Sequence, residues 1–231
     1  MQTTTALYKE IWAQDHTAEV RLIISGEEYL QKDIVSMGTY GGLFSVPGIG
    51  NCSSRQISLE ILPHGNIPRQ AKMQVYVRLK TSTQVSEWIQ KGEFFISRRQ
   101  KNKRTGSLTI TGYDAMLKTE QVWLDSTYAE ENWPMPQAAA VADIAQRIGV
   151  EVDSRTQLST LFPVDYPVDE NGNLTMREVL GFIAVSNAGN WIITDQGKLL
   201  LVKFGDLPTE TSYLVSEDGD AITFGGDRIL V

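Results

Sequence analysis

The sequence predicts an α+β fold that is mainly β, and three observations lead to this prediction. Short segments in which apolar and polar residues alternate fill the first half of the chain. Longer segments with the apolar spacing of a helix lie in the second half. The formal charge also changes sign: residues 1–118 hold 15 Lys and Arg against 10 Asp and Glu, whereas residues 119–231 hold 6 against 18. A change of this size indicates two units with different surfaces.

Alternation with period two predicts the strands of the first half, each with one buried and one solvated face. Turn-rich segments that contain Gly, Pro, Asn and Ser separate these strands, which favours a small barrel or sandwich. The predicted strands include residues 20–24, 57–61, 73–79, 94–96 and 108–110. Leu7 and Ile11, four residues apart, predict a short helix before them.

Two helices and a hairpin are predicted in the second half. Apolar residues with helical spacing run through 135–148, and Gly149 stands where a helix commonly ends. Thr175 and Glu178 form a capping box, from which the second helix continues to about residue 187. A strand–turn–strand unit over 190–202 completes a small α+β module, residues 119–203, and short strands follow it.

Between the halves, the segment GSLTITGYDAML joins a strand to a helix without a linker. Gly112, Tyr113 and Asp114 form the corner, and Asp114 is placed to cap a helix from Ala115. Corners of this kind can hold a phosphate or a nucleophile, but a glycine, a phenol and one carboxylate provide neither a phosphate-binding loop nor a nucleophile with its base. We interpret Gly112, Tyr113 and Asp114 as a structural corner.

No catalytic residue is predicted. Cys52, His16 and His64 are the only cysteine and histidines, so a Cys–His nucleophile would have to use them. Nothing in the sequence brings them together, and the favoured interpretation is a buried cysteine with two surface histidines. They also lack the spacing of zinc ligands.

A calcium loop is the one metal-site alternative. Asp169, Asn171, Gly172 and Glu178 fall on loop positions three, five, six and twelve, but Pro167 at position one has no side-chain oxygen. A turn before the capped helix is the better interpretation, and we predict no metal and no cofactor.

A basic cluster separates the strands at 94–96 and 108–110. Its five cations are Arg98, Arg99, Lys101, Lys103 and Arg104. They could form a solvated hairpin tip whose charges deter strand pairing, or contact an acidic protein. Nucleic acid is the least favoured partner because no aromatic residues interleave the cations. These five residues are the candidates for contact with a partner.

Neither a membrane span nor a signal peptide is predicted. No apolar run approaches the roughly 18–20 residues of a transmembrane helix. The N-terminus lacks the basic and apolar regions of a secretory signal. A single cysteine allows no disulfide within the chain.

The order of several segments resembles the baseplate hub proteins of phage tails. These segments are LYKEIWAQDHTAEVRLIISG, IGNCSSRQISLEI, WIQKGEFFIS, GSLTITGYDAMLK and TMREVLGFIAVSNAGNWIITDQGKLLLV. More narrowly, the chain resembles prophage-encoded hub proteins of Gram-positive bacteria, which are related to the late-control D proteins.

The resemblance implies a tail-tube-like β-barrel over residues 1–118, completed by 204–231, with 119–203 as the inserted α+β module. It implies a structural protein of the virion tail, assembled in the bacterial cytoplasm, that forms a homo-oligomer, suggested to be a trimer. Its partners would be tube, spike or distal tail components. Hub proteins usually carry a second barrel, for which 231 residues leave little room, so the chain could be a shortened member or a fragment.

The alternative function is a cell-wall-degrading tail-tip enzyme or its carbohydrate-binding module. An enzyme would need a catalytic set that the sequence does not present. Sugar binding would need exposed aromatic rings, whereas the pattern around the tryptophans predicts core positions for them. They are Trp12, Trp88, Trp123, Trp133 and Trp191.

Overall fold

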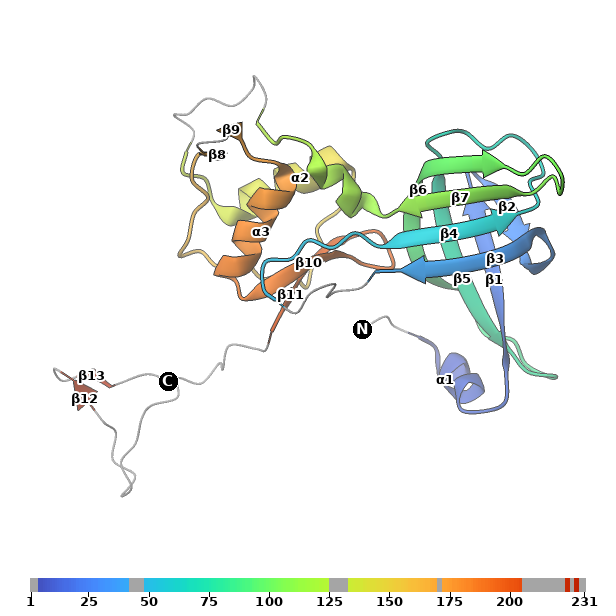
Figure 1. Ribbon diagram of the computed structural model, residues 1–231. Coiled ribbons are helices and arrows are strands. Elements are labelled where there is room, and N and C mark those ends of the chain that lie inside the picture. The colour runs from blue at the N-terminus through green and yellow to red at the C-terminus, as the bar shows by residue number, and fades with distance from the viewer. Residues whose placement is uncertain are drawn as a thin grey trace.

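The computed structural model describes residues 4–41, 48–124, 133–169, 172–204, 223–224 and 227–228. It is mainly β and has two parts, a curled antiparallel sheet and the smaller α+β module beside one end of it (Figure 1). None of the helices in these ranges is long and apolar enough to cross a membrane.

The sheet has seven strands in the order β2-β1-β5-β6-β7-β4-β3, and all neighbours are antiparallel. It curls on itself, as Figure 1 shows. The strands are β1 (Thr17–Ile24), β2 (Glu27–Leu30), β3 (Ile34–Tyr40), β4 (Gln56–Ile61), β5 (Lys72–Lys80), β6 (Ile89–Lys101) and β7 (Leu108–Tyr113); the 3-10 helix η1 (Gln31–Asp33) joins β2 to β3.

The inner face of the sheet holds its hydrophobic core. Along β4, Ile57, Leu59 and Ile61 are buried while the residues between them are partly exposed, as period-two alternation predicts. Gly112 on β7 marks a close approach within this core. A Cβ atom there would lie 2.5 Å from Met73 Cε and 2.9 Å from the carbonyl oxygen of Phe95, so only glycine fits.

The α+β module contains two helices, a hairpin and a short two-stranded ribbon. The 3-10 helix η2 (Ala115–Glu120) leads into it directly from β7. Its elements are α2 (Gln137–Ile148), β8 (Val168–Asp169), β9 (Gly172–Asn173), α3 (Met176–Ser186), β10 (Gly189–Ile193) and β11 (Leu199–Lys203).

The module has its own core, in which Trp123 and Trp191 are fully buried, as the sequence predicts. Their indole nitrogens are satisfied, because Trp191 Nε1 donates to the carbonyl oxygen of Leu180 at 2.8 Å and Trp123 Nε1 donates to Asp143 at 2.6 Å. Burying two such rings together with apolar faces of α2 and α3 gives the module a separate hydrophobic interior.

The predicted N-terminal helix is present as α1 (Ala6–Trp12). It places Ile11 against the sheet, where this side chain is fully buried. The prediction that Trp12 lies in the core is wrong, because its side chain is 63% exposed. Successive residues of a helix point about 100° apart, so a helix that buries Ile11 turns Trp12 away from the sheet.

Two predicted elements differ in detail from the structure. Helix α2 begins at Gln137, after Pro136, and not at residue 135. The helix after Asp114 is a single 3-10 segment and not an α-helix. Of the last segment, β12 (Thr223–Phe224) and β13 (Asp227–Arg228) pair with each other, and the rest of 205–231 lies outside the described residues. The completion of the barrel by 204–231 therefore stays a prediction.

Candidate interaction site

The corner at the end of β7 is organised by one buried carboxylate. Asp114 Oδ1 accepts hydrogen bonds from Ser54 Oγ at 2.9 Å and from the Met116 N–H at 3.1 Å, which caps η2. Its Oδ2 accepts from the Arg55 N–H at 3.0 Å. Burial raises the pKa of the Asp114 carboxyl, and the donors on Arg55, Ser54 and Met116 counter that rise. The corner is therefore fastened to the start of β4.

Arg55 extends this connection into the α+β module. Its Nε lies 3.6 Å from Asp114 Oδ2, its Nη1 donates to Asp195 Oδ1 at 2.7 Å, and its Nη2 donates to the carbonyl oxygen of Thr194 at 3.2 Å. Thr194 and Asp195 belong to the turn between β10 and β11. We call Asp114, Arg55 and Asp195 the joint, because they link the sheet, the corner and the module.

A backbone connection runs beside the joint. The segment before β4 of the sheet meets β10 of the module in a parallel bridge between Cys52 and Trp191. Gly50 N donates to the carbonyl oxygen of Gly189 at 3.0 Å, and Trp191 N donates to that of Asn51 at 2.8 Å. The Asn190 amide bridges the same two segments, since its Oδ1 accepts from Asn51 N at 2.7 Å. Several hydrogen bonds therefore fix the module to the sheet.

A third link involves Lys118, on the far side of the corner. Its Nζ donates to the carbonyl oxygen of Ile148 at 2.9 Å and lies 3.7 Å from the centroid of the Phe95 ring. Burial lowers the pKa of this amine. Two clefts of about 710 Å³ and 520 Å³ flank the corner, and Lys118 lines the larger one. Its amine contacts Ile148 of α2 and Phe95 of β6, and so links these two elements.

The candidate nucleophile has no acid–base partner among the contacts of the described residues. Cys52 is buried, and burial raises the pKa of its thiol to about 12. Its Sγ lies 3.7 Å from the carbonyl oxygen of Arg177. His16 contacts the carbonyl oxygen of Gln14, and His64 stacks on a tyrosine near Asp33. The two histidines are thus engaged elsewhere.

The calcium-loop alternative, less favoured than a turn, falls only partly on described residues. Glu178 Oε2 accepts from Thr175 N at 2.7 Å, and Thr175 Oγ1 accepts from Glu178 N at 3.2 Å, so the carboxylate caps α3. Asn171 lies outside the described residues, as does the side chain of Asp169. Within the described ranges, no three His, Cys, Asp or Glu side chains gather as metal ligands would.

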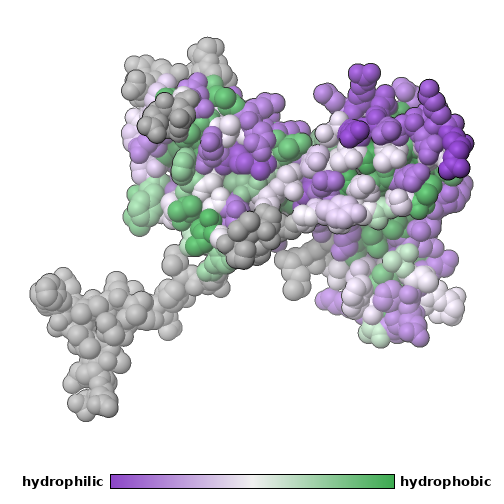
Figure 2. All heavy atoms as spheres, in the orientation of Figure 1, coloured by the Kyte–Doolittle hydropathy of each residue, from purple (hydrophilic) through white to green (hydrophobic). Residues whose placement is uncertain are grey.

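The basic cluster covers the end of β6, which carries Arg98, Arg99 and Lys101, and the turn to β7, which carries Lys103 and Arg104. We call residues 98–104 the basic hairpin. Its five cations lie on exposed residues at the end of the sheet remote from the module (Figures 1 and 2). Asn102 organises the turn: its Oδ1 accepts from Arg104 N at 3.0 Å, and its backbone N–H donates to the Ser107 carbonyl oxygen at 2.9 Å. Arg99 Nη1 donates to the carbonyl oxygen of Ile67.

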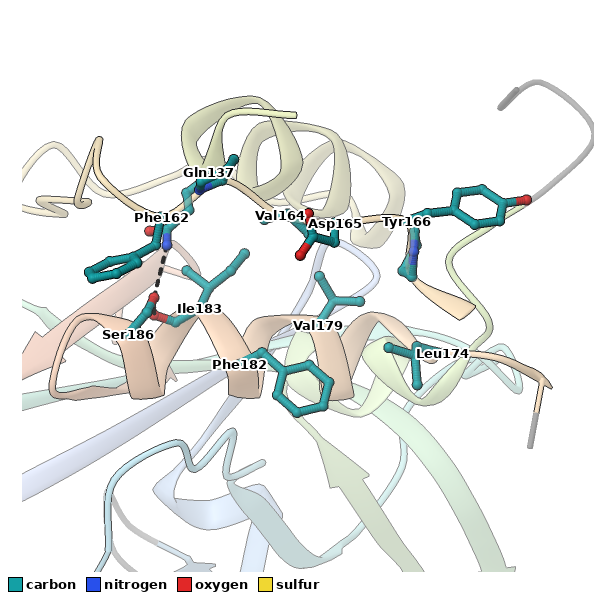
Figure 3. Close-up of a pocket in the computed structure, with 12 residues that line it drawn as sticks. Gln137, Phe162, Val164, Asp165, Tyr166, Leu174, Val179, Phe182, Ile183 and Ser186 are labelled. Atoms are coloured by element: carbon teal, nitrogen blue, oxygen red, sulfur yellow. Dashed lines mark hydrogen bonds between the residues drawn. The ribbon is translucent and has the colours of Figure 1, made fainter. Parts of the chain in front are cut away.

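A small cavity of about 290 Å³ lies in the module between α3 and the extended segment 162–167. Figure 3 shows Val179 and Ile183 pointing from α3 toward Val164 across this cavity. Its polar end is closed by the hydrogen bond from Gln137 Nε2 to Ser186 Oγ, at 2.8 Å. The lining could hold an apolar side chain, but it presents no nucleophile with a neighbouring base.

Hydrophobic side chains are also exposed around this cavity. Phe182 and Val185 on α3 are 63% and 58% exposed, and Phe162 is 54% exposed. Figure 2 shows hydrophobic residues gathered on this face of the module. Groups of exposed apolar residues commonly mark contact surfaces.

Solved structures with a similar fold are tail proteins, one of them from a prophage. The chain matches the 43 kDa tail protein of prophage MuSo2 from Shewanella oneidensis with a TM-score of 0.56, at 12% sequence identity, over 86% of this chain and 59% of that one. It matches a tail protein of Neisseria meningitidis MC58 with a TM-score of 0.53, at 14% identity, over 83% of this chain and 53% of that one.

The fold is similar to that of these two tail proteins. The prophage tail protein gp18 from Listeria monocytogenes is less similar, with a TM-score of 0.42 at 9% identity over 87% of this chain and 64% of that one. No family model and no curated protein matches the sequence. The chain spans little more than half the length of the first two tail proteins.

The sequence pattern missed the partners of the corner. Arg55 and Asp195 are 140 residues apart, and no local pattern connects them. Asn51 and Asn190 are likewise 139 residues apart. The sequence held only a weak signal for this contact: Asp195 lies in a predicted turn, and Arg55 precedes the predicted strand 57–61.

Proposed function

We propose that the chain is a structural component of a phage or prophage tail with a hub-like place in the baseplate. The observation that carries this proposal is the shared fold, which extends over 86% of the chain in the match to a prophage tail protein. The order of segments described above also supports a hub-like protein of prophages.

In this proposal the curled sheet is a tail-tube-like barrel, and the protein acts through its surfaces and not through catalysis. Copies assemble into a homo-oligomer, suggested to be a trimer, in the virion tail. Tube, spike or distal tail proteins are its neighbours. The exposed apolar residues of α3 and the basic hairpin supply complementary shape and charge.

Native mass spectrometry tests the proposal, with the chain alone and mixed with the tail proteins encoded beside it. We expect a defined oligomer or a complex with at least one tail protein. A chain that stays monomeric and binds none of those proteins would contradict the proposal.

One observation favours carbohydrate binding as a second candidate function. The Trp12 ring is exposed, and its centroid lies 6.3 Å from that of Tyr8 and 5.4 Å from that of His16. These residues line a groove of about 480 Å³ together with Lys9 and Lys91. Exposed aromatic rings can pack against the apolar faces of sugars.

Cosedimentation with purified cell walls separates the two candidates. A carbohydrate-binding module should cosediment, and Trp12→Ala should abolish this while leaving the fold intact, since Trp12 is not part of the core. Cosedimentation that Trp12→Ala leaves unchanged would exclude this groove as the binding site.

A further inference from the structure

Aromatic rings line the groove of about 480 Å³ between α1 and the sheet. Tyr8 and Trp12 are four residues apart, so their side chains project from the same side of α1, and His16 follows shortly after the helix. The ring planes of Tyr8 and Trp12 differ by only 14°, and those of Trp12 and His16 differ by 32°. The three rings therefore form one platform, and we call the site that they line the aromatic groove.

Trp12 is more exposed than the packing of α1 requires. Ile11 anchors the helix and is fully buried, whereas Trp12 is 63% exposed. A large aromatic ring left in water forgoes the free energy that its burial would supply. A platform of such rings is typical of a surface that binds a ligand.

Hydrogen bonds within the chain fix α1, and with it the platform, against the sheet. Thr5 Oγ1 accepts from Tyr8 N at 3.1 Å, which caps the helix. Thr5 also donates twice to Glu87, from its N to Oε1 at 2.9 Å and from its Oγ1 to Oε2 at 2.7 Å. A ligand that binds to a surface fixed in this way loses little affinity to ordering of the protein.

Two lysines from different elements line the same groove. Lys9 lies in the last turn of α1, where the helix dipole favours a cation. No such reason applies to Lys91 on β6. It is the extra residue of a β-bulge, because its neighbours Gln90 and Gly92 pair with consecutive residues of β5, and bulges redirect side chains. Neither lysine has an ion pair in the part of the chain that the structure describes.

The polar groups of the aromatic groove indicate the charge of its ligand. Its described lining contains no Asp, Glu, Asn or Gln side chain. Carboxylates and carboxamides are the usual side-chain acceptors for the hydroxyl groups of a neutral sugar. A lysine ammonium only donates, and it carries a positive charge. The groove therefore favours a ligand that brings its own anionic acceptors.

We propose that the aromatic groove binds an acidic saccharide. Sugar rings pack on Tyr8 and Trp12, and the carboxylate or phosphate groups of the saccharide pair with Lys9 and Lys91. The inference rests on the second candidate function above, carbohydrate binding, and goes beyond it by naming the class of sugar.

Isothermal titration calorimetry tests the role of charge with oligogalacturonate and its methyl ester, in which the carboxylates are neutralised. We expect the wild-type protein to bind the acid at least about fivefold more tightly than the ester, and added salt to reduce this difference. Trp12→Ala should lose binding to both. Glycosylated poly(glycerol phosphate) is the phosphate-bearing probe, and tighter binding of this polymer than of oligogalacturonate would assign phosphate as the group that the lysines hold.

Two double variants separate the groove from the overall charge of the protein. Lys9→Gln with Lys91→Gln removes both lysines of the groove and should abolish the preference for the acid. Lys32→Gln with Lys101→Gln makes the same change at two exposed lysines outside the groove and should retain the preference. Circular dichroism verifies the fold of all variants. An equal loss in the two double variants would overturn the proposal.

Three further outcomes separate this inference from the proposed functions. Equal affinity for the acid and the ester, without tighter binding of the phosphate polymer, would overturn it and leave carbohydrate binding standing. Binding of polyglutamate but of neither saccharide would overturn it in favour of an acidic protein as the ligand. A protein that binds none of these probes would also overturn it, whereas the oligomer measured by native mass spectrometry does not depend on this groove.

Discussion

Replacing Asp114 with alanine would remove the acceptor for three hydrogen bonds, from Ser54 Oγ and from the Arg55 and Met116 N–H groups. An alanine methyl group cannot replace them. A buried backbone donor left without an acceptor costs about 1–3 kcal/mol, and loss of a helix cap costs about 1 kcal/mol. We therefore expect the free energy of unfolding to fall by about 3 kcal/mol, out of a total of about 5–15 kcal/mol for a typical protein.

Urea denaturation followed by circular dichroism measures this loss. Asp114→Asn keeps the size and one carbonyl oxygen, so it should lose less than Asp114→Ala. Asp195→Ala removes only the partly exposed end of the joint and should cost about 1 kcal/mol or less. A loss below about 1 kcal/mol for Asp114→Ala, or one no larger than for Asp195→Ala, would refute this account of the corner.

Three further predictions concern single sites. Because burial raises the pKa of the Cys52 thiol to about 12, a thiol reagent at pH 8 should label it only after unfolding. Arg155 holds the pKa of Asp153 at about 2, below its ordinary 3.8, so this pair stabilises the native state above about pH 4 and loses that effect toward pH 2. Arg155→Gln should flatten the fall in denaturation midpoint over this range. Gly112→Ala should cost about 1–3 kcal/mol in urea titrations, because its Cβ would meet Met73 and a backbone carbonyl; an unchanged midpoint would contradict the packing.

The sequence predicts a structural feature well when the residues that determine it are close together in the chain. The buried positions of β4 follow from alternation within six residues, and the start of α3 follows from a capping box of four residues. The predicted burial of Trp12 is wrong because it depends on which side of a short helix faces the sheet. Ile11 lies on that side. The joint lies beyond local patterns, because Arg55 meets a carboxylate 140 residues away.

The joint also gives the proposed assembly its geometry. The basic hairpin lies at one end of the sheet, and the α+β module begins at the other, across the corner that Asp114 and Arg55 hold. Whether a heterologous contact closes into a ring or continues as a filament depends on the rotation between successive copies. That rotation depends on the contact between copies and on the fixed arrangement of sheet and module within one copy. Hydrogen bonds, an ion pair and the backbone contacts of Gly50 and Asn51 with β10 fix the sheet relative to the module, so in the proposed homo-oligomer the rotation is set by the contact between copies.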